Sequence, residues 1–545
     1  MRIRRPGDLA VVAALAWLAL WPLVVTALAA FESEAGPGAA WREFASRGSE
    51  WTALSRSLVV SLASVALAAA VGVPLAFLFA RAEFPGRRVL AELVALPVAL
   101  PPLVGVVAFL YLWGESGLGT RLVMAGLGLE RAPWRLDGLG AILLVHGYSM
   151  YVYFYLFVRA ALARFDGALV EAAASLGAGR LRRFVRVVVP ALRPALAGAA
   201  VLTFLSALGS FSAPYIFGGN YRVMTTQILA SKQNGEVDLA EVETVVLTLV
   251  ALAVLVLARR LDRGEASRRR GSAPHPRRAV GRGARRALGA AGWALALFLL
   301  APHLTLVLLS FVPRGTWSTE LLPPVLSGTN YRILFGSAEA LRPVANSLAM
   351  ALVATGAALG LGFAAARAAR RGGWSGRAAD LLIAIPWAVP ATAFAVALAT
   401  THSVVQPWSG RFLLVGTFAI LPLAYLARSL PMTGRAALAG LGQLDPGLEE
   451  AAASLGAGRL RTLWRVTLPV LRPALVAGAL LAFLTSFGDF VASIVLYTFE
   501  TRPIAIEILA RLRLQETGVA AAYGVLLTAL SAAVFLVWGR EKETP

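Results

Sequence analysis

Two stretches of this chain repeat one another almost residue for residue. Residues 171–196 read EAAASLGAGRLRRFVRVVVPALRPAL, and residues 450–475 read EAAASLGAGRLRTLWRVTLPVLRPAL. With a shift of 279 positions, 20 of these 26 residues are identical. Similarity this strict in a partly polar segment indicates a tandem duplication in which both copies meet the same kind of surface. Duplication without a shared role is the alternative, and the greater divergence of the flanking segments argues against it.

The repeat continues more weakly on both sides of the strict match. The repeated residues form the pairs Ser57/Ser347, Pro97/Pro386, Pro101/Pro390, Asp166/Asp445, Leu169/Leu448, Phe204/Phe483, Gly209/Gly488 and Phe211/Phe490. We therefore divide the chain into a first half at residues 1–260, a basic linker at 261–287 and a second half at 288–545. The repeated loops occupy residues 166–194 and 445–473.

The composition indicates a membrane protein. Of the 545 residues, 58% are hydrophobic and 15% are charged, whereas soluble proteins carry about 45–50% apolar and about 25% charged residues. A spanning helix needs about 20 mostly apolar residues. Such stretches lie near 9–30, 55–80, 89–113, 139–162, 195–218, 241–258, 288–312, 346–366, 378–400, 412–430, 474–497 and 520–538. This predicts an all-α polytopic membrane protein with about twelve transmembrane helices, as two tandem six-helix halves in a pseudo-twofold arrangement.

Charge predicts the orientation. If the N-terminus is cytoplasmic, 36 of the 51 Lys and Arg residues fall on the cytoplasmic side, as the positive-inside rule requires. We therefore expect both termini in the cytoplasm of a bacterium and the chain in its inner membrane. The first span exceeds the usual length of a signal-peptide core, so we expect it to be retained. The Arg-rich linker is expected near anionic lipid headgroups, and it lacks the interleaved aromatic residues typical of nucleic-acid binding.

Each strict repeat reads as a short capped helix beside the membrane. Asp166 and Asp445 are natural N-caps, and Gly177 and Gly456 suit a left-handed C-cap. Glutamates near the first turn are favoured by the helix dipole. One narrow apolar face combines Leu and Ala at helical spacing, namely Leu169, Ala172, Ala173 and Leu176, repeated at Leu448, Ala451, Ala452 and Leu455.

This pattern resembles the EAA loop of permease subunits in ATP-binding-cassette importers. The resemblance implies that Glu171, Ala172, Ala173 and Gly177 form one docking element for an ATPase, and that Glu450, Ala451, Ala452 and Gly456 form the other. It further implies two separate ATPase subunits and an extracytoplasmic substrate-binding protein. The fused arrangement is most similar to ferric iron permeases, with thiamine permeases next. The segments 209–214, 488–494 and 502–504 carry the likeness to the iron group.

Several kinds of chemistry have no residues to support them. The sequence contains no G-x-x-x-x-G-K-[ST] phosphate loop, so ATP hydrolysis is expected on a partner chain. The four histidines lack ligand spacing and there is no cysteine, so neither a cofactor nor a tight metal site is expected. Two other classes stay open as alternatives: an ion-coupled secondary transporter, and a membrane-bound enzyme or polymer synthase.

Ionisable residues near the spans give further hypotheses. Asp489 and its repeat counterpart Ser210 are candidate pathway or gate residues, although Asp489 could instead pair with an arginine or cap an irregular helix end. His146 is expected to be a hydrogen-bonded packing residue. Acidic residues preceding the second and sixth spans, among them Glu50 and Glu243, are expected in solvated outer loops, with docking of a binding protein as the alternative.

Overall fold

The computed structural model describes residues 6–33, 36–98, 101–262, 281–317, 320–404 and 413–539. These residues form helices joined by short loops, without a β-strand among them. Ten of the described helices are long and apolar enough to cross a membrane, or eleven if the bent pair α18–α19 is counted as one span. This confirms the all-α polytopic fold. Residues 263–280 of the predicted linker lie outside the described residues.

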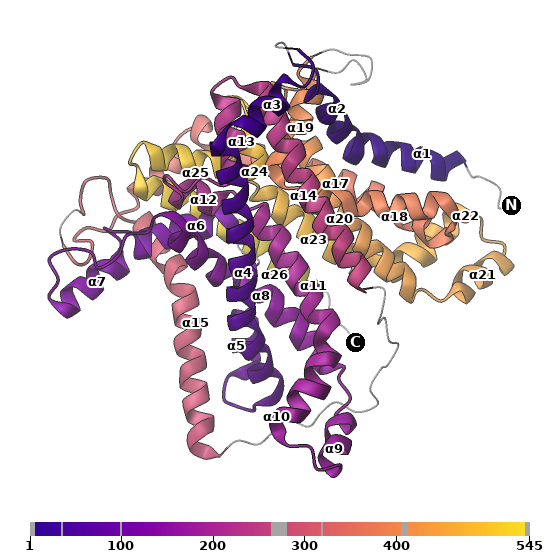
Figure 1. Cartoon of the computed structure of the whole chain (residues 1–545), viewed down its shortest axis with the longest axis horizontal. Coiled ribbons are helices and arrows are strands. Elements are labelled where there is room, and N and C mark those ends of the chain that lie inside the picture. Colours follow the sequence, from indigo (N-terminus) through magenta and orange to yellow (C-terminus); the bar gives the residue numbers. More distant parts are fainter. Residues whose placement is uncertain are drawn as a thin grey trace.

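The first half contains the following elements, drawn in indigo to magenta in Figure 1: α1 (Pro6–Leu15), α2 (Trp21–Ala29), α3 (Ala39–Ser46), α4 (Gly48–Arg81), α5 (Arg87–Leu93), α6 (Pro102–Trp113), α7 (Leu118–Leu127), α8 (Gly138–Ala163), α9 (Ala168–Ser175), α10 (Arg180–Arg183), α11 (Val189–Leu208), α12 (Ser212–Phe217), α13 (Met224–Gln233) and α14 (Val237–Asp262). A short π-helical turn, η1 (Ala16–Leu20), joins α1 to α2, and another, η3 (Phe184–Val188), joins α10 to α11.

The second half follows in pink to yellow with α15 (Arg282–Ser310), α16 (Thr329–Phe335), α17 (Ala338–Arg371), α18 (Gly373–Ala388), α19 (Ala391–His402), α20 (Ile420–Gln443), α21 (Pro446–Ser454), α22 (Arg459–Thr462), α23 (Leu468–Phe487), α24 (Val491–Leu496), α25 (Ile504–Arg513) and α26 (Thr517–Gly539). The π-helical turn η5 (Leu463–Thr467) precedes α23, as η3 precedes α11. The elements of the second half follow the order of the first, apart from α7.

Five of the predicted spans differ from the helices of the structure. The stretch 89–113 is divided between α5 and α6, and the stretch 378–400 is divided between α18 and α19, which are bent by 109°. The stretches 195–218 and 474–497 are interrupted because α11 ends at Leu208 and α23 ends at Phe487, just before the repeated glycines. The stretch 412–430 is replaced by α20, which begins at Ile420 and includes Arg428 and Arg435. Charged side chains lower the mean hydropathy of α20, so counting apolar residues gave twelve spans where ten or eleven helices qualify.

The first helical segment of each half packs against the other half. Helices α1 and α2 pack against α18 and α19 of the second half, whereas α15 packs against α5 and α6 of the first half. Figure 1 shows the same exchange, with α1 beside α18 and α15 beside α5. An ion pair between Asp8 and Arg371 ties α1 to the second half. The two halves are therefore interlocked.

The long helices of each half cross at a glycine. A methyl group at Gly72 of α4 would lie 2.3 Å from the backbone oxygen of Tyr151 in α8. In the second half, a methyl group at Gly362 of α17 would lie 2.5 Å from Oγ1 of Thr433 in α20. Only a residue without a side chain permits such close helix contacts.

The repeated serines before these glycines have a structural role. The Ser57 hydroxyl oxygen accepts a hydrogen bond from the Met224 N–H, 2.7 Å away, at the start of α13. The Ser347 oxygen accepts one from the Ile504 N–H, 2.9 Å away, at the start of α25. A helix start leaves N–H groups without intrahelical partners, so each serine satisfies one of them from a distant helix.

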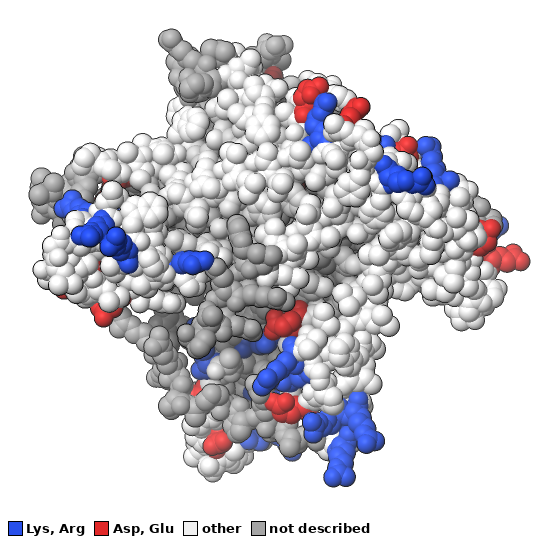
Figure 2. Space-filling model, turned by 180° about the vertical axis from the view of Figure 1, so that it is seen from behind, with Lys and Arg blue, Asp and Glu red and all other residues white. Residues whose placement is uncertain are grey.

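A large part of the protein surface is apolar and uncharged. Figure 2 shows Lys and Arg side chains along the margins of one face and a broad area between them without charged groups. Large apolar side chains on the spanning helices are exposed, among them Leu62 on α4 and Val353 on α17. Exposed apolar surface of this extent is typical of helices that contact lipid.

Candidate functional site: two exposed loops and a cavity between the halves

The two strict repeats fold into matching short helices. The Asp166 carboxylate accepts a hydrogen bond from the Ala168 N–H, 3.0 Å away, at the start of α9. The Asp445 carboxylate accepts one from the Gly447 N–H, 2.9 Å away, at the start of α21. Gly177 and Gly456 follow the helices with φ of 77° and 79°, in the left-handed region that glycine adopts readily.

These helices present apolar side chains to the surroundings. Leu176 and Leu455, each just after its helix, are both 88% exposed, and Leu169 and Leu448 are both 45% exposed. Glu171, Ala172 and Gly177 are exposed and Ala173 is half-buried, and the equivalents Glu450, Ala451 and Gly456 are exposed with Ala452 half-buried. Equal exposure at equivalent positions gives two similar surfaces that a symmetric partner could bind.

Each loop is connected mechanically to a long helix. The π-helical turns η3 and η5 lie between the loop and α11 or α23. Pro190 and Pro469 lie two residues after these turns and carry no N–H, so an ordinary α-helical hydrogen bond is missing at this point. Widened turns of this kind occur where a missing hydrogen bond breaks the regular ladder. A continuous helical segment therefore leads from each loop into its long helix.

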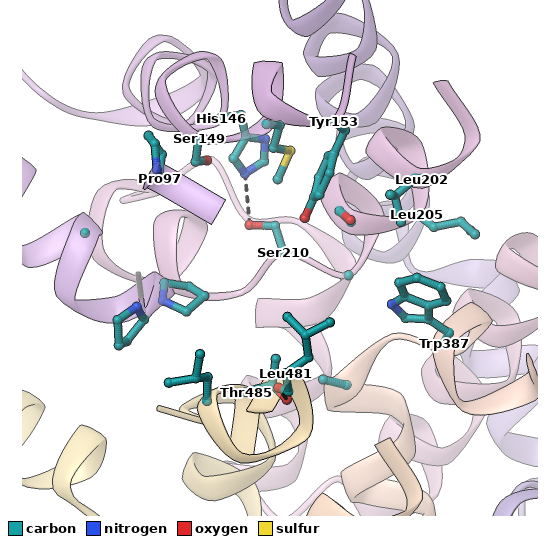
Figure 3. A pocket seen from close by; sticks show the side chains of 18 of the residues that line it. Pro97, His146, Ser149, Tyr153, Leu202, Leu205, Ser210, Trp387, Leu481 and Thr485 are labelled. Atoms are coloured by element: carbon teal, nitrogen blue, oxygen red, sulfur yellow. Dashed lines mark hydrogen bonds between the residues drawn. The ribbon is translucent and has the colours of Figure 1, made fainter. Parts of the chain in front are cut away.

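A cavity of about 1470 Å³ lies between the halves. Its wall extends from Pro194 of α11 and Arg435 of α20 to Ser210, Phe211 and Pro390. Figure 3 shows side chains from both halves around this space. Its polar and charged lining residues are Glu92, His146, Tyr148, Ser149, Tyr153, Ser206, Ser210, Ser212, His303, Arg428, Arg435, Thr485, Thr528 and Ser531. The described residues include no group of three or more His, Cys, Asp or Glu side chains that could hold a metal ion.

Ser210 belongs to a hydrogen-bonded chain at the cavity wall. His146 is buried, and its Nε2 atom lies 2.9 Å from the Ser210 hydroxyl, the bond drawn in Figure 3. Its Nδ1 atom lies 2.8 Å from the hydroxyl of Ser64 in α4. The prediction for His146 is thus confirmed, because both ring nitrogens are hydrogen-bonded within the packed helices.

Asp489 lies between α23 and α24 and is nearly buried. Its Oδ1 atom accepts hydrogen bonds from the N–H groups of Ala492 and Ser493, at 2.9 and 3.1 Å. Its Oδ2 atom is 4.0 Å from Nε of Arg428, which lines the cavity. Both structural roles considered for Asp489, helix capping and pairing with an arginine, are therefore present. Arg428 thus both lines the cavity and pairs with Asp489, and nothing in the sequence pattern pointed to it.

The repeated glycines and prolines meet across the halves. Gly209 lies against Pro390, and Gly488 lies against Pro101. The repeated phenylalanines follow the glycines and also meet, with 5.7 Å between the ring centroids of Phe211 and Phe490. Tyr215 stacks on Phe211 at 5.1 Å, and its hydroxyl contacts Arg513. These residues pack together at the end of the cavity farthest from the loops, and we call them the gate cluster after the role proposed for them below.

Two tandem helical halves around a shared cavity, each with an exposed capped loop, define a polytopic permease. Residues 72–266 and 358–539 both match the family described as the binding-protein-dependent transport system inner membrane component. The chain belongs to this family. It is therefore a membrane component of an ATP-binding-cassette importer that works with an extracytoplasmic binding protein.

Curated relatives cover much of the chain. A probable ABC transporter permease protein, y4fN of Sinorhizobium fredii, is 28% identical over 462 aligned residues, which make up 83% of this chain and 81% of the relative. The ferric transport system permease protein FbpB of Actinobacillus pleuropneumoniae is 28% identical over 81% of this chain and 64% of its own length. The thiamine transport system permease protein ThiP of Brucella abortus is 32% identical over 45% of this chain and 44% of its own.

Proposed function

We propose that this permease carries ferric iron, delivered by its binding protein, and that two separate ATPase subunits drive it through α9 and α21. The exposed, matching loops carry the proposal for the ATPases. Two equivalent surfaces require two equivalent partners, and the π-helical turns give each loop a direct connection to a cavity-lining helix. Both termini lie in the cytoplasm under this proposal, because the loops and the basic segments then share that side.

The cavity and the gate cluster support the route for the cargo. The two halves contribute equivalent residues to the gate cluster, so rotation of one half against the other would separate Phe211 from Phe490 and open the cavity at that end. Ser210 and the Asp489–Arg428 pair lie beside this contact and are the proposed pathway or gate residues. The domain boundaries at residues 260 and 288 belong to the same proposal, because each half then contains one complete repeat.

The assignment of the cargo rests on the relatives. A ferric relative aligns with four-fifths of this chain, whereas the thiamine relative aligns with less than half. Thiamine is therefore the second candidate. An ion-coupled secondary transporter is not supported, because the chain belongs to a family of binding-protein-dependent transport components.

Uptake of labelled ferric iron tests the cargo and the loops together. Cells lacking this protein should lose high-affinity uptake, and the wild-type chain should restore it. The double variant Glu171→Ala with Glu450→Ala should insert normally, fail to restore uptake and retain less ATPase on purification. Glu339→Ala provides a matched control, since Glu339 is an exposed glutamate in the first turn of α17.

The possible outcomes separate the parts of the proposal. Unchanged iron uptake in the deletion strain would overturn the iron assignment, and labelled thiamine would then be tested in the same cells. Full retention of the ATPases by the double variant would overturn the role of the loops, whatever the cargo.

A further inference from the structure

Two glutamates near the start of α4 are completely buried. Glu50 in the first turn of α4 and Glu243 in α14 are each 0% exposed. Acidic residues are almost never buried to this extent unless a partner satisfies them. The expectation that both belong to solvated loops is wrong, because α3 and α13 pack against α4 and α14 packs against both of them, at the top of Figure 1.

Each carboxyl group has one satisfied oxygen and one unsatisfied oxygen. Oε1 of Glu50 accepts hydrogen bonds from Nε2 of Gln227 at 3.1 Å and from the Ser49 hydroxyl at 3.0 Å. Oε1 of Glu243 accepts one from the Ser231 hydroxyl at 2.7 Å. The Oε2 atoms of both glutamates are buried and receive no hydrogen bond from an N–H or O–H group of the described residues. The two carboxyl groups are within hydrogen-bonding reach of each other.

Two carboxyl groups can hydrogen bond only if one of them holds a proton. A pair of buried carboxylates without that proton would combine a desolvation penalty with repulsion between like charges. A single proton between them supplies the missing donor and removes one charge. We propose that Glu50 and Glu243 together form a binding site for one proton, which they share, and that this proton holds α13 and α14 against the start of α4.

The arginine and the other carboxylates nearby have other partners. Arg47, which precedes α4, pairs with Glu236 at 2.9 Å and also with Glu43 of α3. On α14, Asp238 accepts a hydrogen bond from Ser33 and Glu241 accepts one from Thr400. The remaining charged group on α13 is Lys232, whose pKa is lowered by burial. The proton is therefore the partner that the Glu50–Glu243 pair lacks.

In the second half, the equivalent contact between helices is made by groups that need no shared proton. By the repeat, Glu50 corresponds to Ala340 and Glu243 to Tyr523. The Tyr523 hydroxyl donates a hydrogen bond of 2.6 Å to the Ala340 carbonyl oxygen, again joining the last long helix to the start of the long crossing helix. The first half thus has an ionisable contact where the second half has a neutral one.

The proposed proton site is connected to the gate cluster. Gln227 and Ser231 both belong to α13, so the glutamates hold this helix through two side chains. The hydroxyl of Thr225, also on α13, donates a hydrogen bond of 2.8 Å to the carbonyl oxygen of Ser210. Loss of the proton would therefore loosen the helix that holds one side of the gate cluster.

Unfolding of the full chain in mixed micelles, measured against pH, tests the proposal. Free glutamate titrates near pH 4.3, so above about pH 5 the unfolded chain has lost this proton while the folded chain keeps it. The unfolding equilibrium constant of the wild type should then rise about tenfold per pH unit until the site titrates. Glu243→Gln and Glu50→Gln should each remove this contribution to the slope, because an amide donates the hydrogen bond without a titrating proton.

Two control variants keep the test informative. Glu236→Gln changes a neighbouring carboxylate that pairs with Arg47, and it should keep the slope. Tyr523→Phe removes the equivalent contact of the second half, and it should lower stability while keeping the slope. Infrared spectroscopy should show a protonated carboxyl C=O band at neutral pH that both glutamine variants lose. An unchanged slope in the glutamine variants, or stabilisation by Na⁺ in place of protons, would overturn the proposal.

Discussion

A methyl group placed on Gly488 of the second half would lie 2.9 Å from Cβ of Pro101 in the first half. The counterpart is looser, since a methyl group on Gly209 would lie 3.5 Å from Cα of Pro390. The pseudo-twofold contact at the gate cluster is thus tighter on one side than on the other.

This difference predicts unequal effects of two equivalent substitutions. Gly488→Ala should destabilise the closed gate cluster by about 1–3 kcal/mol, the usual cost of overpacking, and Gly209→Ala should cost less. Thermal unfolding and cargo uptake of the two variants provide the measurement. An equal loss of stability in the two variants would contradict this prediction, because it would show that Pro101 moves away from the new methyl group without a cost in free energy.

A second prediction concerns the crossing of the long helices. Gly362→Ala should cost about 1–3 kcal/mol, because the new methyl group meets both Oγ1 of Thr433 and the backbone nitrogen of Gly434, 2.9 Å away. A methyl group on Gly360 of the same helix would have no neighbouring atom within 4 Å. Gly360→Ala should therefore leave the stability of the protein unchanged or raise it by up to about 1 kcal/mol. Unfolding free energies of the pair check this. A Gly362→Ala protein as stable as the wild type would contradict the close contact.

A third prediction separates the two roles of Asp489. Asp489→Asn keeps an oxygen that can accept from the N–H groups of Ala492 and Ser493, but it removes the charge opposite Arg428. Asp489→Ala removes both, so it should be less stable than the asparagine variant by about 1 kcal/mol, the usual value of a helix cap. Thermal unfolding of both variants measures this difference. If the two variants unfold alike, the ion pair and not the cap is what Asp489 contributes.

A fourth prediction concerns the loop leucines. Leu176→Ser with Leu455→Ser should leave stability unchanged, because both side chains are 88% exposed. Burial of a leucine by a partner contributes about 1.5–3 kcal/mol, so loss of either should weaken ATPase binding tenfold or more. Titration of the purified chain with its ATPase gives the affinity. Leu514→Ser, at an exposed leucine between α25 and α26, is the control and should bind normally.

Much of the fold could be predicted from local patterns. The repeat at 171–196 and 450–475, the helix caps at Asp166 and Asp445, and the apolar spans all depend on residues close together in the chain. Capping and hydrophobic periodicity are local effects, so a sequence displays them directly. The breaks at Gly209 and Gly488 were missed because a glycine within an apolar stretch has no single structural meaning.

The duplication, the helical membrane fold and the two capped loops were determined by the sequence itself. Only the tertiary structure decided that Gly488 meets Pro101, that Arg428 pairs with Asp489, and that Glu50 meets Glu243. These residues are separated by tens to hundreds of positions, and nothing in their local sequence specifies a partner. The packing of α3, α13 and α14 around α4 removed water from the two glutamates, and burial is what turns a pair of ordinary surface acids into a proposed proton site.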